Sequence, residues 1–125
     1  MPENGIKTRY SQEELDEFDA LIDQKLAVAR EQLDYYLNQL NELADNPDAK
    51  TKGLDDIAGS LETERLNQLA ARQQKLVHHL ENAKIRIKNG VYGICRVTGK
   101  LISPARLRLV PHATLSIEAK EKGLG

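Results

Sequence analysis

The stretch that decides the fold is YGICRVTGK, residues 92–100. Cys95, the only cysteine of the chain, lies between two glycines, as a ligand does in a zinc knuckle. A four-cysteine site needs a second cysteine three residues later and then another such pair. Those places hold Thr98, Ser116 and Ala119. One sulfur, two neutral hydroxyls and a methyl group cannot complete a tetrahedral zinc site, so the stretch predicts a zinc-finger frame without its metal.

Upstream of this frame, the apolar residues form two helical stripes. Ser11 and Glu14 have the spacing of a capping box, which predicts a helix from residue 11 to about residue 44. Pro47 ends that helix. A second helix is expected to begin at Ser60, or one turn earlier at Asp55, and to end at Asn89-Gly90. The stripes are Leu15, Phe18, Ile22, Leu26, Ala29, Leu33, Leu37, Leu40 and Ala44, and then Leu66, Leu69, Gln73, Leu76, Leu80, Ala83 and Ile87.

Two stripes of similar length joined by a short connection predict an antiparallel helical hairpin. The expected fold is therefore mainly all-α, with a disordered lead (1–10), a hairpin (11–90) whose tip is residues 45–59, and a finger-like C-terminal module (91–125) with a final helix over 112–120. Without metal, about 30 residues are too few to fold alone, so the module should be held on the hairpin by a hydrophobic plug. The candidates are Ile94, Val97, Leu101, Ile102, Leu107, Leu115 and Ile117.

Composition narrows the class of protein. The chain has 125 residues, 30% of them charged and 4% aromatic, which suits one small domain with exposed helices. It has no apolar run long enough to span a membrane and no signal-peptide pattern, so we expect a soluble, cytoplasmic protein without membrane partners. Residues 11–44 hold nine acidic and two basic side chains, and residues 60–90 hold three acidic and six basic. We expect the acidic helix to be attracted to the basic one.

Other chemistries have weaker support in the sequence. Cys95 could be a redox sensor, although a structural role is the simpler interpretation. A metal could be bound by Cys95, His112 and one of His78 and His79. No nucleophile, base and acid are arranged as in an enzyme, so we expect no catalytic activity. The basic segment 96–110 could meet DNA, but no sequence-reading motif accompanies it.

The sequence also carries a family resemblance. The motif Tyr-Gly-x-Cys-x-x-x-Gly (92–99) is followed by Ile102, Pro104, Arg106-Leu107, Pro111-x-Ala113 and LSIEAK (115–120). This pattern resembles the DksA/TraR family, whose members carry a four-cysteine finger after a long helical hairpin and include zinc-free forms. The resemblance covers most of the chain, most strongly residues 60–120. It implies that the degenerate ligand positions Cys95, Thr98, Ser116 and Ala119 hold no zinc.

The resemblance also implies a partner. Proteins of this family insert the hairpin into the secondary channel of bacterial RNA polymerase, where acids of a tip pattern Asp-x-x-Asp-x-Ala act near the catalytic metal. Here GLDDIA (53–58) keeps Asp56 and Ala58, whereas a gapless count from Cys95 places Asp55 at the second acid. Both registers stay open, and the tip candidates are Asp55, Asp56 and Ala58. The alternative is that the two acids only cap the second helix.

Two further sets of positions follow from the same resemblance. Arg72 and Arg106 match positions that contact polymerase. The positions of the family's alarmone contact fall on His79, Val110 and Lys120, and only the lysine is kept, which does not favour guanosine tetraphosphate as a ligand.

The function expected from these observations is transcription regulation through polymerase binding, with no recognition of a DNA sequence. Two alternatives stay open: a helical-hairpin adaptor or dimerisation module, and a small DNA-binding protein that uses the basic segment. Steep loss of binding with salt would distinguish the last of these.

Overall fold

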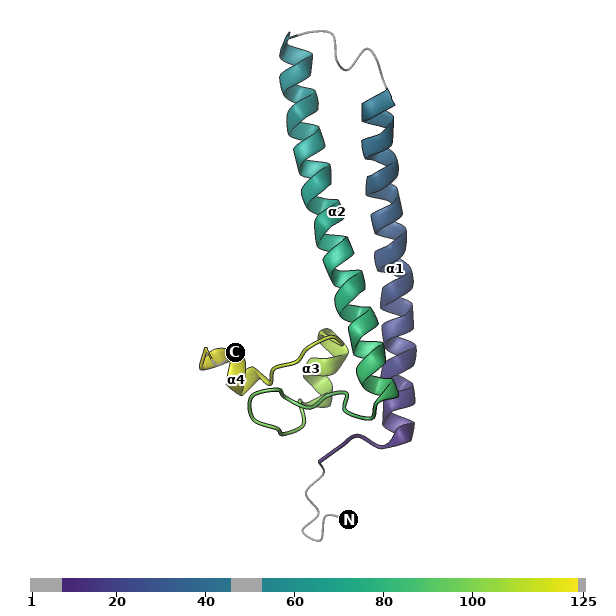
Figure 1. Ribbon diagram of the computed structural model, residues 1–125. Helices are drawn as coiled ribbons and strands as arrows, with labels where there is room; N and C mark the ends of the chain where they lie inside the picture. Colours follow the sequence, from purple (N-terminus) through teal and green to yellow (C-terminus); the bar gives the residue numbers. More distant parts are fainter. Residues whose placement is uncertain (1–7, 46–52, 124–125) are drawn as a thin grey trace. The chain divides into compact units, whose positions relative to one another are not determined.

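The computed structural model describes residues 8–45 and 53–123, with the backbone alone described for residues 45 and 53–58. Four helices follow one another in this part of the chain: α1 (Gln12–Asp45), α2 (Gly53–Lys88), α3 (Pro104–Leu109) and α4 (Ile117–Glu121). Contacts divide the chain into two compact units (Figure 1). One, the base unit, joins the residues up to Lys25 with those from His79 onward, and the other, the distal unit, is Leu26–His78.

Helix α1 begins with the expected capping box. The Ser11 backbone N–H donates to Glu14 Oε1 at 2.9 Å, and the Glu14 N–H donates to Ser11 Oγ at 3.2 Å. These two bonds satisfy donors that the first turn of a helix leaves without partners. The predicted first helix is therefore confirmed within one residue at each end.

Helix α2 begins two residues before Asp55, the earlier of its two predicted starts. Its first residue is Gly53, so Ser60 lies inside the helix and does not cap it. Gly59 lies within the second turn and does not interrupt the helix, because one interior glycine costs only about 1 kcal/mol. The C-terminus is as expected: Gly90 has a φ of 75°, and the Val91 N–H donates to the Arg86 carbonyl at 3.0 Å. Residues 46–52 of the expected tip lie outside the described residues.

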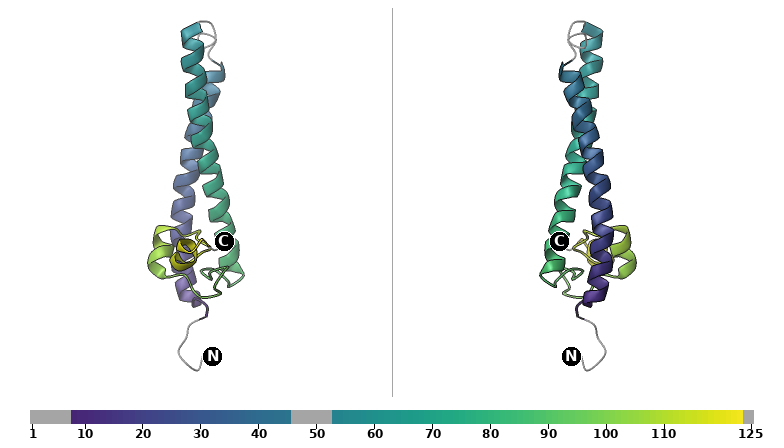
Figure 2. Two further views of the ribbon diagram at one scale, coloured as in Figure 1. Left: turned by 90° about the vertical axis from the view of Figure 1, so that its left-hand side faces the viewer. Right: turned by 90° about the vertical axis from the view of Figure 1, so that its right-hand side faces the viewer.

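In the distal unit, the two helices run antiparallel and side by side (Figures 1 and 2). Leu26, Ala29, Leu66 and Ala70 are buried, whereas Leu37 of the predicted stripe is 44% exposed. Two helices bury only the faces they turn to each other, so a stripe here is covered on one side alone.

In the base unit, the ends of α1 and α2 share a core with the C-terminal module. Ile22, Leu80, Ile102 and Leu107 are fully buried. Tyr10 is also buried, which corrects the expectation that residues up to 10 form a disordered lead; residues 1–7 lie outside the described part. Its ring packs edge-on against Phe18 at 5.3 Å between centroids, and Phe18 lies 5.4 Å from Tyr92. Three aromatic rings thus join the segment before α1 to the module.

The predicted hydrophobic plug is correct in part. Ile102 and Leu107 are buried as expected, but Val97 is 41% exposed and Ile117 50% exposed. Val97 lies in the turn after Cys95, and Ile117 is the first residue of α4. Because helical positions two apart point about 200° away from each other, α4 buries Ala119 and turns Ile117 outward.

The final helix is shorter than predicted. Helix α4 covers Ile117–Glu121 and is capped by Ser116, whose hydroxyl accepts from the Ala119 N–H at 3.1 Å. Residues before it use their carbonyls elsewhere: Thr114 O accepts from the Arg96 N–H and Leu115 O accepts from Arg106 Nε. These cross-module bonds replace the helical ladder that an earlier start would need.

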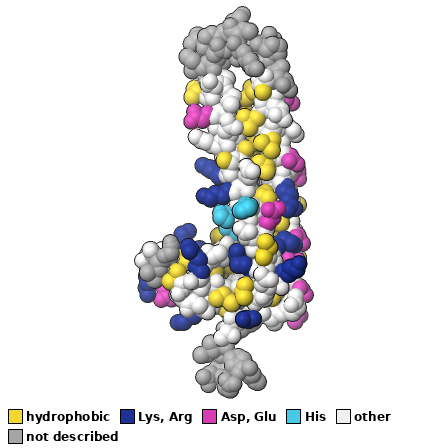
Figure 3. Space-filling model, viewed as in Figure 1, with side chains coloured by type: hydrophobic (Ala, Val, Ile, Leu, Met, Phe, Trp, Pro, Cys, Tyr) yellow, Lys and Arg dark blue, Asp and Glu magenta, His cyan; other side chains and the backbone are white. Residues whose placement is uncertain are grey.

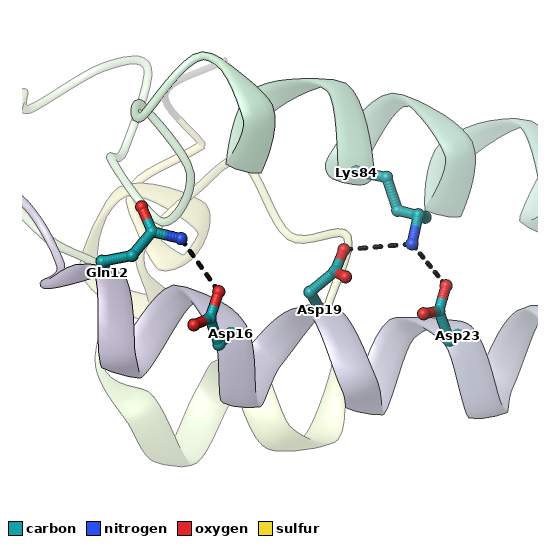
Figure 4. Close-up of polar contacts among 5 residues, drawn as sticks. All are labelled: Gln12, Asp16, Asp19, Asp23 and Lys84. Carbon is teal, nitrogen blue, oxygen red and sulfur yellow. Dashed lines mark hydrogen bonds and ion pairs between the residues drawn. The ribbon is translucent and has the colours of Figure 1, made fainter.

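One ion-pair group joins the two long helices within the base unit. Lys84 of α2 contacts Asp19 of α1 at 3.1 Å and also pairs with Asp23, while Gln12 donates to Asp16 at 2.8 Å (Figure 4). The expected attraction between acidic and basic helices takes this form. No helix among the described residues is long and apolar enough to cross a membrane.

Candidate functional site: the C-terminal module

The module is built around a tight backbone loop. The Cys95 N–H donates to the Lys100 carbonyl at 2.8 Å, the Gly99 N–H returns to the Cys95 carbonyl at 2.9 Å, and Ile94 and Leu101 form an isolated antiparallel bridge. Gly99 has a φ of 73°, a conformation that glycine adopts without strain. The sequence thus forms a knuckle by hydrogen bonds of its own backbone.

The sulfur of Cys95 is the centre of this knuckle. Its Sγ accepts the backbone N–H of Thr98 at 3.5 Å and that of Ser116 at 3.3 Å. The Cys95 side chain is buried, and the chain segments that carry the two donors come from opposite ends of the module. A single thiol therefore ties together the two segments in which a zinc finger would place its two cysteine pairs.

The other three degenerate ligand positions have different roles. The Thr98 hydroxyl accepts the Lys100 N–H at 3.2 Å, and the Ser116 hydroxyl accepts the Ala119 N–H at 3.1 Å. Ala119 is fully buried. The hydroxyls cap turns, and the methyl group fills core space.

These residues do not fit a zinc ion. A structural zinc site uses thiolate or imidazole ligands, and here two of the four positions hold hydroxyls already bonded to backbone N–H groups and one holds a methyl. Over residues 8–45 and 53–123, no group of three His, Cys, Asp or Glu is placed to hold a metal ion. The alternative trio of Cys95, His112 and a histidine of α2 is therefore not brought together.

The surroundings of Cys95 also act on its acidity. Burial raises the pKa of the thiol, but the Thr98 side chain and the N–H groups of Ser116, Thr98 and Val97 favour the thiolate, and together they lower the pKa from 9.0 to about 6. Hydrogen bonds to the charged form lower the pKa of an acid. The lowered pKa favours the thiolate form of Cys95. In this structure its sulfur accepts two backbone N–H groups.

Two tyrosines anchor the module, and sequence reasoning missed both. The Tyr92 hydroxyl donates to the Pro111 carbonyl at 2.7 Å, and the Tyr10 hydroxyl donates to the Ile102 carbonyl. Gly93 makes room for Tyr10, since a Cβ on Gly93 would lie 2.6 Å from the tyrosine ring. Burial raises the pKa of both phenols, so they stay protonated donors. In the sequence the signal was Gly93 of the Tyr-Gly motif, a position without a side chain against which the Tyr10 ring packs.

The predicted polymerase-contact residues lie in different settings. Arg72 is exposed on α2. Arg106 of α3 is half-buried, and its Nε donates to the Leu115 carbonyl at 2.8 Å, so this arginine also braces the module. Asp55, Asp56 and Ala58 fall in the first two turns of α2, and their side chains are outside the description.

Of the three positions that the resemblance assigns to the alarmone contact, Lys120 alone is a lysine or arginine. His79 of α2 stacks on His112, with ring centroids 5.5 Å apart and planes 7° from parallel. Val110 is apolar, and Lys120 is exposed on α4. His79 is therefore occupied by a contact within the protein.

The hairpin and the knuckle define the class: a helical-hairpin protein with a four-cysteine-finger frame that keeps one ligand. A family model described as the prokaryotic dksA/traR C4-type zinc finger matches residues 90–122. The RNA polymerase-binding transcription factor DksA of Caulobacter vibrioides is 36% identical over 103 residues, which is 79% of this chain and 70% of that protein. The chain therefore belongs to the DksA/TraR family.

Two further comparisons agree with this assignment. General stress protein 16O of Bacillus subtilis is 33% identical over 64 residues, covering 50% of this chain and 39% of that protein. The solved structure of transcription factor DksA2 from Pseudomonas aeruginosa matches with a TM-score of 0.78 and 28% identity, covering 87% of this chain and 81% of that one. The resemblance in the sequence and the predicted fold class are thereby confirmed.

Proposed function

We propose that this protein regulates transcription by binding bacterial RNA polymerase through the secondary channel, with the hairpin tip acting near the active site. The observation that carries the proposal is the identity of 36% over 79% of this chain with a relative named for polymerase binding. A helical hairpin ending in acidic residues is consistent with it. In this proposal the protein works without zinc or guanosine tetraphosphate and without recognising a DNA sequence.

The binding step is proposed to use Arg72 and Arg106. Arg72 gives the cleaner test because it is exposed, whereas replacing Arg106 would also remove its bond to the Leu115 carbonyl. We expect Arg72→Ala to weaken binding to purified polymerase at least severalfold. Lys75→Ala, an exposed change of the same charge one turn away on α2, should leave it nearly unchanged.

The regulatory step is proposed to use the acids at the start of α2. Asp55→Asn together with Asp56→Asn should leave polymerase binding largely intact and abolish the effect on transcription from sensitive promoters. Glu64→Gln removes an exposed acid further along α2 and serves as the matched control. The two single variants settle the register, since the one that matches the family's second acid should account for most of the loss.

Two outcomes would overturn the proposal. If the parent does not bind purified polymerase, the adaptor interpretation replaces it, or the DNA-binding interpretation if DNA is bound with a steep salt dependence. If the parent binds but the double variant regulates like the parent, the two acids are helix caps and the channel mechanism fails.

A further inference from the structure

A stacked pair of histidines, His79 and His112, joins α2 to the C-terminal module. His79 and Arg86 are seven residues apart on α2 and so lie on one face of the helix. The His79 ring stacks on the His112 ring, and an Arg86 guanidinium nitrogen lies 3.4 Å from the His112 carbonyl oxygen. Histidine side chains are visible beside Lys and Arg side chains on the face in Figure 3. Two contacts thus fasten residue 112 to α2.

His112 is poorly prepared to carry a charge. Its Nδ1 atom is buried and has no hydrogen-bond partner among the described residues. Protonation makes both ring nitrogens donors, so a charged ring would hold a buried N–H without an acceptor. The neutral ring can leave that atom as an unprotonated acceptor, which costs less.

The groups that act on His112 are all basic. They are His79 and Arg86 from α2 and Arg106 from α3. Burial is the largest cause that lowers the pKa of His112, and these three neighbours lower it further. Arg86 keeps its charge at any physiological pH, since an arginine is not deprotonated in proteins.

We propose that the His79–His112 stack is an acid-sensitive joint, which holds residues 110–116 on α2 while the His112 ring is neutral and releases them when that ring becomes charged. A charged His112 ring is repelled by the guanidinium groups of Arg86 and Arg106, and its buried Nδ1–H adds a desolvation cost. The released segment connects α3 to α4, so acid loosens the module at its C-terminal half. This inference concerns the chain alone and does not depend on the proposed function.

The direction with pH follows from linkage. The pKa of His112 is lower in the folded protein than its ordinary value of 6.5, so the opened state binds the proton first as the pH falls. The closed joint is fully favoured above about pH 6.5 and is lost as the pH falls towards the folded pKa. One proton can raise the open-to-closed ratio by up to about tenfold per pH unit.

The test measures hydrogen exchange of the full-length protein between pH 7.5 and 5, corrected for intrinsic rates. The reporter is the Ala113 amide, which donates to the Val110 carbonyl at 2.9 Å, and the reference is the Asn89 amide at the end of α2. In the parent, Ala113 protection should fall by several-fold or more while Asn89 protection changes little. His112→Phe keeps an aromatic ring without the proton and should flatten the response.

His78 provides the matched control. Like His79 it is exposed, but it points about 100° away on the helix, so His78→Gln should respond like the parent. Cys95 also titrates in this range, but it is present in every variant, so the difference between parent and His112→Phe isolates the joint. A flat parent profile, or an unchanged fall in His112→Phe, would overturn the proposal. If His112→Phe does not fold, His79→Gln is tested in its place. In that variant Ala113 protection should fall less with acid than in the parent, and an equal fall would overturn the proposal.

Discussion

The base unit and the distal unit are built from the same two helices, yet they are packed differently. In the distal unit, the buried side chains among the described residues are Leu26, Ala29, Leu66 and Ala70. In the base unit, the C-terminal module adds Tyr92, Ile102 and Leu107 to the core, and Tyr10 joins from the segment before α1. Antiparallel helices become a well-filled core only where a third element covers them.

The difference shows what holds a finger frame whose four ligand positions offer one thiol. A module of this size lacks the buried area to fold alone. Here the missing stabilisation comes from the hairpin base, through aromatic contacts, two tyrosine hydrogen bonds and a cysteine sulfur that accepts two backbone N–H groups. We therefore expect the free energy of unfolding to depend most on the base unit.

Deleting apolar volume from the base unit should have the largest effect. Leu107→Ala removes a fully buried side chain and should lower the free energy of unfolding by about 2–5 kcal/mol. Leu109→Ala is the matched control in the same helix, since Leu109 is 80% exposed, and should change it by less than about 0.5 kcal/mol. Leu37→Ala in the distal unit should fall between the two. Denaturant unfolding measures all three, and a loss at Leu37 equal to that at Leu107 would break the comparison between the units.

Closing the space beside Tyr10 should have the next largest effect. Gly93→Ala combines a positive φ, about 1–2 kcal/mol, with a clash against the tyrosine ring that costs about 1–3 kcal/mol more. Gly99→Ala shares the positive φ but has no atom within 4 Å of the added Cβ, so it should show only the first cost. The difference between the two melting curves measures how tightly Tyr10 holds the module. Equal losses would mean that the ring moves away freely.

Cys95 should show a smaller effect with a characteristic pH dependence. Cys95→Ser should cost about 1–2 kcal/mol, less than Leu107→Ala, since it replaces the sulfur by a smaller hydroxyl that does not ionise and removes no large apolar volume. The folded pKa is lowered from 9.0 to about 6, so the stabilisation is present above pH 9 and is lost as the pH falls towards 6. Ultraviolet thiolate absorbance should titrate near pH 6 in the parent and vanish in the variant. A midpoint near 9 would show that the backbone N–H groups do not stabilise the thiolate.

The stability of the base unit should not depend on zinc. Elemental analysis of the purified protein should find no stoichiometric zinc, and a chelator should not shift the melting temperature, because the four ligand positions offer one thiol. If one zinc per chain is found, and a chelator removes it and unfolds the protein, zinc binding and not hydrophobic packing would explain the stability of the base unit.

The smallest effect is expected from the ion pairs of Lys84. Lys84→Met keeps the apolar stem and removes the pairs with Asp19 and Asp23, which are partly exposed to solvent. The free energy of unfolding should fall by less than about 1 kcal/mol, and the loss should shrink in high salt. A larger loss that shrinks in high salt would mean that charge, and not apolar packing, holds the two helices together.

The sequence by itself determined the two long helices, the caps at Ser11 and Gly90, the helical hairpin, and the knuckle around Cys95. These features depend on local rules: apolar periodicity, capping side chains and glycines at positive φ. The family was also recognisable, since its motif lies in the contiguous stretch 92–120. The starts of α2 and α4 were less well predicted, because an interior glycine costs a helix only about 1 kcal/mol and a carbonyl can be diverted by a distant donor.

Only the tertiary structure decided which residues hold the C-terminal module on the hairpin. Val97 and Ile117 were expected in the plug and are exposed, while Tyr10 and Tyr92 fill the space, and Cys95 accepts donors from residues 3 and 21 positions away. The contact of His79 with His112 joins residues far apart in the chain. Periodicity specifies which face of a helix is buried but not what covers it, and in this protein the covering element is an irregular segment whose side chains follow no period.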